Sequence, residues 1–147
     1  MNIVTSEDPI LKQKSVAYTV EEIKSIETQR FIDELFNTMF NSDGIGISAV
    51  QVGVLKRVIC VNTPNFSEVM FNPVILKRLK PITGTEGCLS FPGIVKDIKR
   101  SSKIHVKWID RRGKSKYSEV TGLAARAIQH ECDHLNGKTF DTYGETL

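Results

Sequence analysis

Two histidines and a glutamate near the end of the chain could bind a metal ion and use it. The segment His130-Glu131-Cys132-Asp133-His134 places the two histidines four positions apart. In an α-helix such residues lie on the same face, so both imidazoles could reach one ion, with Glu131 beside it as a base. The pattern is typical of metal-dependent hydrolases.

A catalytic metal usually needs a third protein ligand and an open position for water. Cys88 is the best candidate, because Gly87 precedes it and Pro92-Gly93 follows it, so the backbone can turn closely around an ion. A thiolate with two imidazoles would bind Fe(II), Zn, Ni or Co and would reject Mg or Ca. Taken alone, Cys88 could equally be a small buried hydrophobic residue.

The remaining histidine and cysteines are weaker candidates. Residues 103–109 alternate in the manner of a strand, which puts His105 on the face opposite the apolar residues. Cys60 lies in the apolar run 58–61 and is expected to be a core thiol. Cys132 shares the helix of the two candidate ligands but should point away from both.

Helices must position these groups. Residues 121–129 contain good helix formers at apolar spacing, and Asn136-Gly137 provides a stop, so the metal-binding motif is expected on a C-terminal helix. Apolar residues also recur near helical spacing from Thr19, a candidate N-cap, to Phe40. This spacing predicts one long N-terminal helix over residues 19–40.

Strands are predicted over residues 57–62, 69–79, 104–110 and 116–120, and the last two are joined by a hairpin turn at residues 111–114. There are no repeats and no linker-like segments. We therefore expect a single α+β domain over residues 1–147, in which mostly antiparallel strands surround the central metal-binding helix.

Three segments together resemble the peptide deformylase family. Residues 44–51 read Gly-Ile-Gly-Ile-Ser-Ala-Val-Gln, residues 86–90 read Glu-Gly-Cys-Leu-Ser, and residues 129–134 read Gln-His-Glu-Cys-Asp-His. They follow the family patterns Gly-x-Gly-x-Ala-Ala-x-Gln, Glu-Gly-Cys-Leu-Ser and Gln-His-Glu-x-x-His in order and at comparable separations. The resemblance extends over nearly the whole chain.

The resemblance implies a role for each matching residue. The metal ion, with Fe(II) favoured, would be held by Cys88, His130 and His134. Glu131 would act as general base towards a water acidified by the ion and then return the proton to the leaving amine. The side-chain amide of Gln51 and the backbone N–H of Leu89 would stabilise the oxyanion. Taken alone, Gln51 at the start of a strand could equally be a surface residue.

The implied substrate is the formyl group on the N-terminal methionine of a new polypeptide. The resemblance pairs the peptide with backbone around Ile45 and Gly87, and Gly44, Gly46 and Gly87 would permit its close approach. The methionine pocket would be formed by Ile45, Leu123 and Ala127, although each of these could equally be an ordinary core residue.

The chain departs from the family pattern in places. Ser48 stands where alanine is usual, and Val50 stands where proline often occurs; neither carries an expected chemical role. Many bacterial members continue into a further C-terminal helix, whereas this sequence stops ten residues after Gly137. Attachment to the ribosome through such a helix is therefore not expected, although the enzyme could still act close to the ribosome. A short form of this kind could come from a virus or an unusual bacterial lineage.

Composition agrees with a cytoplasmic enzyme that we expect to be a monomer. The chain has 147 residues, 40% of them hydrophobic, and three cysteines that suggest no disulfide framework. Its first residues contain neither a signal peptide nor an apolar membrane-spanning stretch. The net charge is +3, and the basic residues have no interleaved aromatic residues, so a solvated face is favoured over a nucleic-acid surface.

Two other functions fit parts of the pattern. A zinc-dependent peptidase would share the His-Glu-x-x-His helix, but Cys88 and the segment around Gln51 argue against it. A deformylase-like protein that only binds formylated peptides or nascent chains would keep the pocket, but it would be expected to lose Glu131.

Overall fold

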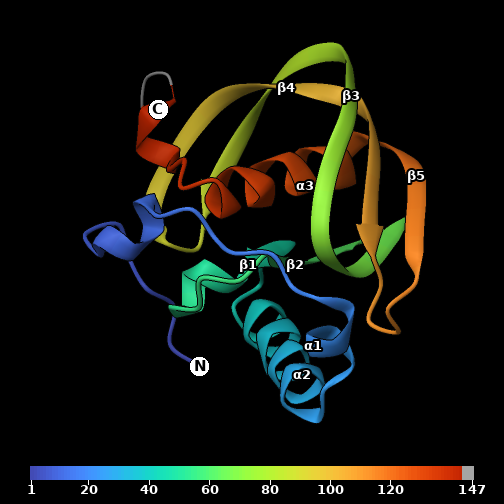
Figure 1. Ribbon diagram of the computed structural model, residues 1–147. Helices are drawn as coiled ribbons and strands as arrows, with labels where there is room; N and C mark the ends of the chain where they lie inside the picture. Colours follow the sequence, from blue (N-terminus) through green and yellow to red (C-terminus); the bar gives the residue numbers. More distant parts are fainter. Residues whose placement is uncertain (144–147) are drawn as a thin grey trace.

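Five antiparallel strands form one sheet in the order β1-β2-β3-β4-β5. They are β1 (Gly46–Ser48), β2 (Val58–Thr63), β3 (Phe66–Cys88), β4 (Phe91–Ile109) and β5 (Ser115–Thr121). The computed structural model describes residues 1–143. In Figure 1 the long hairpin of β3 and β4 curls over a helix, and register shifts between Phe71 and Val74 and between Ile75 and Lys77 interrupt the ladder along it.

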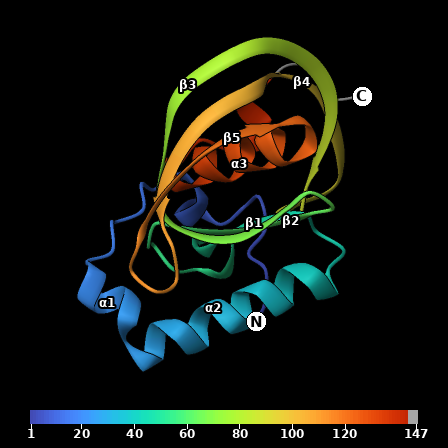
Figure 2. The same ribbon diagram turned by 90° about the vertical axis from the view of Figure 1, so that its right-hand side faces the viewer.

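The helix inside the curved sheet is α3 (Gly122–Leu135), as Figures 1 and 2 show. Its small residues Ala124 and Ala125 and the larger Ile128 pack against sheet residues that include Ile104 and Val106. Burying this apolar face fixes the helix against the sheet. The expected central C-terminal helix is therefore confirmed.

The predicted stop of this helix is also confirmed, because α3 ends at Leu135. The guanidinium group of Arg57 donates to Leu135 O and to Asn136 Oδ1, both at 2.9 Å, which satisfies groups at the helix end. Gly137 has a positive φ of 74°, and a Cβ there would lie 2.5 Å from Lys12 O. Only glycine fits at this position.

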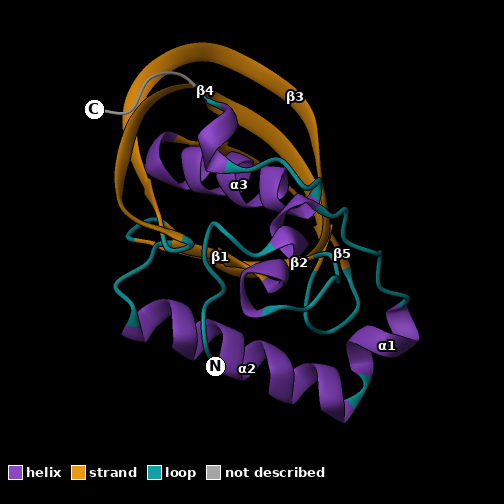
Figure 3. Ribbon diagram, turned by 90° about the vertical axis from the view of Figure 1, so that its left-hand side faces the viewer, coloured by secondary structure: helices purple, strands orange, loops and turns teal. Residues whose placement is uncertain are grey.

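Two further helices lie on the other side of β1 and β2, as Figure 3 shows: α1 (Val20–Lys24) and α2 (Ile26–Asn41). Buried Ile32 and Leu35 belong to one core cluster with Val58 and Cys60 of β2. Ile59 and Val61 of the same strand belong to the cluster that contains α3. Strand β2 is thus buried on both faces, which explains its continuous apolar run.

The prediction of one long helix over residues 19–40 is wrong. Thr19 is an N-cap as expected and forms a capping box with Glu22, but the helix stops after Lys24. Ser25 has extended backbone (ψ 148°); its hydroxyl donates to Glu22 O and accepts from Thr28 N–H, so it ends α1 and caps α2. Ile26 is 65% exposed, although the apolar spacing had placed it towards the core.

All four predicted strands are present, but β3 and β4 extend well beyond residues 69–79 and 104–110, and β1 was not predicted. The predicted hairpin turn at residues 111–114 is confirmed: the Asp110 carboxylate accepts from the backbone N–H groups of Arg112 and Lys114. Short 3-10 helices occur at Pro9–Lys12, Ala49–Val52 (η2) and Phe140–Thr142.

Within residues 1–143, no helix has the length and apolar character needed to cross a bilayer.

Candidate metal centre

The three candidate ligands come from two elements and meet at the inner face of the sheet. Cys88 ends β3, and His130 and His134 lie on α3. One donor atom from each residue lies within 4.8 Å of the others, and Cys88 Sγ is 3.3 Å from His134 Nε2. No other group of three or more such residues is found in residues 1–143.

This donor set fits a borderline-soft divalent ion. Usual Zn–S and Zn–N bond lengths in a tetrahedral site place two such ligand atoms roughly 3.5 Å apart, which is close to the observed separation of Cys88 and His134. Beside the ligands, Glu131 Oε1 is buried and accepts no hydrogen bond from residues 1–143. A buried oxygen without a donor indicates that a group from outside the chain completes the site.

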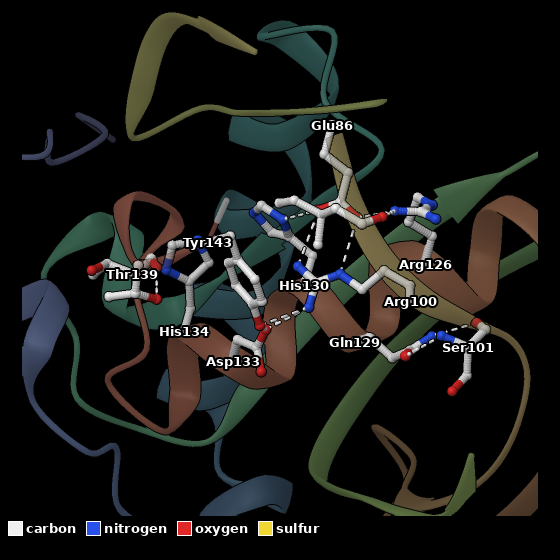
Figure 4. A network of polar contacts seen from close by, with 12 residues as sticks. Glu86, Arg100, Ser101, Arg126, Gln129, His130, Asp133, His134, Thr139 and Tyr143 are labelled. Carbon is white, nitrogen blue, oxygen red and sulfur yellow. Dashed lines mark hydrogen bonds and ion pairs between the residues drawn. The ribbon is translucent and has the colours of Figure 1, made fainter. Parts of the chain in front are cut away.

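The carboxylate of Glu86 contacts the imidazole of His130 and orients it, as Figure 4 shows. Its Oε1 is 2.9 Å from His130 Nδ1, and the carboxylate makes a two-pronged ion pair with Arg100 at 2.9 and 3.0 Å. Arg126 adds a third cationic contact to Glu86. Because Nδ1 is engaged by a carboxylate, the other ring nitrogen, Nε2, is the one that would bind an ion.

The pKa values of the two histidines are shifted in opposite directions, and the pKa of Glu86, which contacts His130, is lowered. Burial raises the pKa of Glu86, but its hydrogen bonds and charges with His130 and Arg100 outweigh burial and lower the pKa to about 2. Burial lowers the pKa of His130, but the charge of Glu131 and the contacts with Cys88 and Glu86 raise it to about 10. For His134, burial and the charges of His130 and Arg100 lower the pKa to about 3, so its imidazole is neutral.

Glu131 is fully buried, and burial raises its pKa to about 7 against the opposing charge of His130. Its neighbour Gly46 is needed for space: a Cβ at Gly46 would lie 2.8 Å from Glu131 Oε2. The glycine was expected to permit approach of a peptide, and the structure shows that it also makes room for this carboxylate.

Gln51 does not start a strand; it lies in η2 and is 1% exposed. The expected start of a strand at Gln51 is therefore corrected, and the alternative of a surface residue is excluded. Its Oε1 accepts hydrogen bonds from the backbone N–H and hydroxyl of Ser48 at 3.0 and 3.1 Å. Its Nε2 donates to Ser90 Oγ at 3.2 Å and lies 3.8 Å from Cys88 Sγ. The amide nitrogen therefore faces the ligand cluster.

A cleft of about 420 Å³ opens beside the ligands. All of the predicted substrate-contacting residues line it: Ile45, Gly46, Gly87, Leu123 and Ala127. Leu89, the expected oxyanion donor, lines it too. Ile45 is 39% exposed and Leu123 is 50% exposed, so neither is an ordinary core residue, whereas Ala127 is also part of the core. A Cβ at Gly87 would meet only Ile94 O, at 4.0 Å, so this glycine leaves open space at the cleft.

The other histidine and cysteines lie away from the site. His105 contacts Tyr117 and Glu119 across β4 and β5, on the face predicted from the alternation. Burial raises the pKa of Cys60 and of Cys132 to about 12, as expected for core thiols.

Sequence reasoning missed the support behind the ligands, namely Glu86, Arg100 and Arg126. The signal for Glu86 was its place in the Glu-Gly-Cys-Leu-Ser segment, two positions before Cys88. No local signal marks the two arginines, because they reach Glu86 across the hairpin and from the helix.

Comparisons with known proteins agree with this geometry. The family model described as polypeptide deformylase matches residues 1–143. A peptide deformylase of Thermodesulfovibrio yellowstonii is 46% identical over 135 residues, which cover 88% of this chain and 80% of that protein. One from Pelotomaculum thermopropionicum is 43% identical over 140 residues, covering 94% and 87%.

Solved structures show the same likeness. The actinonin-bound class I type b peptide deformylase of Acinetobacter baumannii superimposes with a TM-score of 0.93 at 33% identity, covering 99% of this chain and 98% of that one. The peptide deformylase of Thermotoga maritima gives a TM-score of 0.92 at 34% identity, covering 98% and 97%.

Proposed function

The chain belongs to the peptide deformylase family, metalloenzymes that remove the N-formyl group from nascent peptides, and we propose that Cys88, His130 and His134 hold its catalytic ion. The observation that carries this proposal is the convergence of the three donor atoms within 4.8 Å at the cleft. The thiolate and two imidazoles favour Fe(II), Zn, Ni or Co, and among these we propose Fe(II).

When bound, the ion supplies Lewis acidity, which polarises a carbonyl oxygen and acidifies a water. Glu131 acts as general base and then as general acid: its carboxylate takes a proton from the attacking water and returns it to the amine nitrogen. The water oxygen adds to the formyl carbon, the carbon–nitrogen bond breaks, and formate and a free amino terminus leave. Glu131 is buried next to His130 and lines the cleft beside the ligands, and burial raises the pKa of its carboxyl, which favours a group that both accepts and returns a proton.

Gln51 and Leu89 stabilise the negative charge that develops on the formyl oxygen. The amide nitrogen of Gln51 faces the ligand cluster, and Leu89 follows Cys88 directly at the cleft. Donors aimed at a developing oxyanion in a water-poor site lower the barrier by about 3 kcal/mol each.

The cleft binds the formyl-methionine end of the substrate. Its half-exposed apolar side chains Ile45 and Leu123, together with Ala127, offer an apolar pocket for the methionine side chain. An extended peptide lies beside the backbone around Ile45 and Gly87, where the glycine leaves open space. Recognition through backbone lets the enzyme accept many sequences after the methionine.

One catalytic domain over residues 1–147 acts as a monomer in the cytoplasm, where nascent chains become available. Support for one domain comes from the single sheet curled around one helix, and support for a reducing compartment comes from the three cysteines, none of which is in a disulfide.

The test is formate release from formyl-Met-Ala-Ser by protein purified without oxygen and loaded with Fe(II). We expect turnover by the native protein and a fall of about 10²–10⁴-fold in Glu131→Gln, with metal content and peptide binding retained. Turnover that survives the substitution would remove Glu131 from its role. Peptide binding without turnover in fully metallated native protein would favour a binding protein.

A further inference from the structure

Ser48 is a buried polar residue to which the reaction described above gives no role. It is 0% exposed at the end of β1, in a position where the family pattern has alanine. Its hydroxyl donates to Gln51 Oε1 at 3.1 Å, and its backbone N–H donates to the same oxygen at 3.0 Å. Both hydrogen-bond donors of Ser48 therefore act on Gln51.

Two donors meet the oxygen of the Gln51 amide, and the backbone donor decides which way the amide faces. A backbone N–H can only donate, so the amide atom opposite it must be the oxygen, and the hydroxyl fills the second lone pair of that oxygen. A flipped amide would set its NH₂ group against the backbone N–H of Ser48 and lose that bond, whereas the hydroxyl could accept from the NH₂ group instead of donating. The backbone N–H therefore sets the direction of the amide, and the hydroxyl adds a second bond that holds the amide oxygen in place.

This orientation of the amide directs Gln51 Nε2 towards the candidate metal ligands. It faces Ser90 Oγ at 3.2 Å and Cys88 Sγ at 3.8 Å. Hydrogen bonds accepted by an amide oxygen also polarise the amide and strengthen its N–H groups as donors. The Ser48 hydroxyl thus acts on both the placement and the strength of the donor.

We propose that Ser48 is a positioning residue of the deformylation reaction, whose hydroxyl holds the Gln51 amide with its nitrogen towards the developing oxyanion. The inference rests on the function proposed above, because it assigns Gln51 its task. It predicts an effect on the chemical step and little effect on peptide binding, since the oxyanion exists only in the transition state.

The experiment measures kcat and KM for formyl-Met-Ala-Ser with Fe(II)-loaded variants. Loss of one neutral hydrogen bond to a group that acts in the transition state should lower kcat of Ser48→Ala by about fivefold and leave KM within about twofold. Ser15→Ala is the matched control, because Ser15 is also buried but its hydroxyl has no hydrogen-bond partner among residues 1–143. Its kcat should be unchanged.

A double-mutant cycle separates positioning from a general loosening of the segment. Gln51→Ala should lower kcat by about 10²-fold, and adding Ser48→Ala to it should cause no further loss. Ser48→Gly, which also lacks the hydroxyl, replaces Ser48→Ala in the cycle if that variant does not fold.

Each outcome is decisive. An unchanged kcat in Ser48→Ala, or an equal loss in the presence and absence of Gln51, would overturn the inference while leaving the proposed function intact. Native protein that releases no formate when fully loaded with metal would overturn the proposed function, and the role of Ser48 with it.

Discussion

The carboxylate of Glu86 joins three side chains at the site, since His130, Arg100 and Arg126 all contact it. Arg100 in turn reaches Asp133 and Tyr143, so the imidazole of His130 is tied to the end of the described chain. A buried arginine that loses its partner is costly, because its charge stays out of water. The imidazole is therefore held by electrostatics rather than by packing alone.

Glu86→Gln should weaken metal binding by about 10–100-fold and lower the free energy of unfolding by about 3–5 kcal/mol. The physical reason is that Arg100 and Arg126 lose a charged acceptor while staying partly or fully buried. Metal titration and urea unfolding measure the two effects. Glu119→Gln, at an exposed ion pair with Lys103, is the control and should cost less than about 1 kcal/mol. Equal effects of the two substitutions would contradict this account.

The three thiols should differ in reactivity. Cys60 and Cys132 are buried, and burial raises the pKa of each to about 12, so almost no reactive thiolate is present at pH 8. Cys88 is only half-buried. Iodoacetamide should therefore label native, chelator-treated protein once, at Cys88, as mass spectrometry can show, and Zn should protect this thiol. Labelling of Cys60 or Cys132 at a similar rate would show that the core opens.

At the scale of the element, Ser25 separates two helices with a single side chain. Its hydroxyl caps α2 through Thr28 N–H and also bonds to Glu22 O at the end of α1. Ser25→Ala should lower the free energy of unfolding by about 1 kcal/mol, the usual cost of losing an N-cap. Ser42→Ala, at the other end of α2, should stay within about 0.5 kcal/mol in the same urea experiment. A neutral Ser25→Ala would mean that packing of Ile23 and Ile32 alone sets the break.

Elements with strong local periodicity were predictable, and those held by distant partners were not. The position of α3 and its two histidines followed from helical spacing, and the turn at residues 111–114 followed from its residue types. The extent of β3 and β4 did not, because Pro81, Gly84 and Gly93 are typical of turns. Strand β2 pairs with β3 only as far as Phe71, so beyond Val74 one edge of β3 has no neighbouring strand. A proline, which lacks a backbone N–H, is tolerated at such an edge because no partner strand there requires a donor.

The same reason explains what was missed at the site. Spacing within one helix identified His130 and His134, and a glycine-flanked segment identified Cys88. Arg100 lies on β4, fourteen positions after Glu86, and meets it only because the two long strands pair. The sequence did not indicate the hydrogen bond from Ser48 to Gln51, because the two side chains meet only where the 3-10 helix η2 turns Gln51 back towards Ser48.

For the whole molecule, a bound ion would join the end of β3 to α3 and so stabilise the assembled sheet and helix. Zn at 100 times its dissociation constant should add about 2.7 kcal/mol to the free energy of unfolding. For a chain of this size, that raises Tm by roughly 5–10 °C. Calorimetry with and without Zn measures the shift, and Cys88→Ala should abolish it. A shift that persists without Cys88 and both histidines would place the ion elsewhere.

The helix at the centre of the molecule follows all five strands in the chain. During synthesis, His130 and His134 therefore become available only after the whole sheet has been made, and until then Cys88 has no partners with which to bind metal. A growing copy of this enzyme cannot yet remove a formyl group from itself. Any deformylation of its N-terminus while translation is under way must therefore be carried out by another molecule that is already complete.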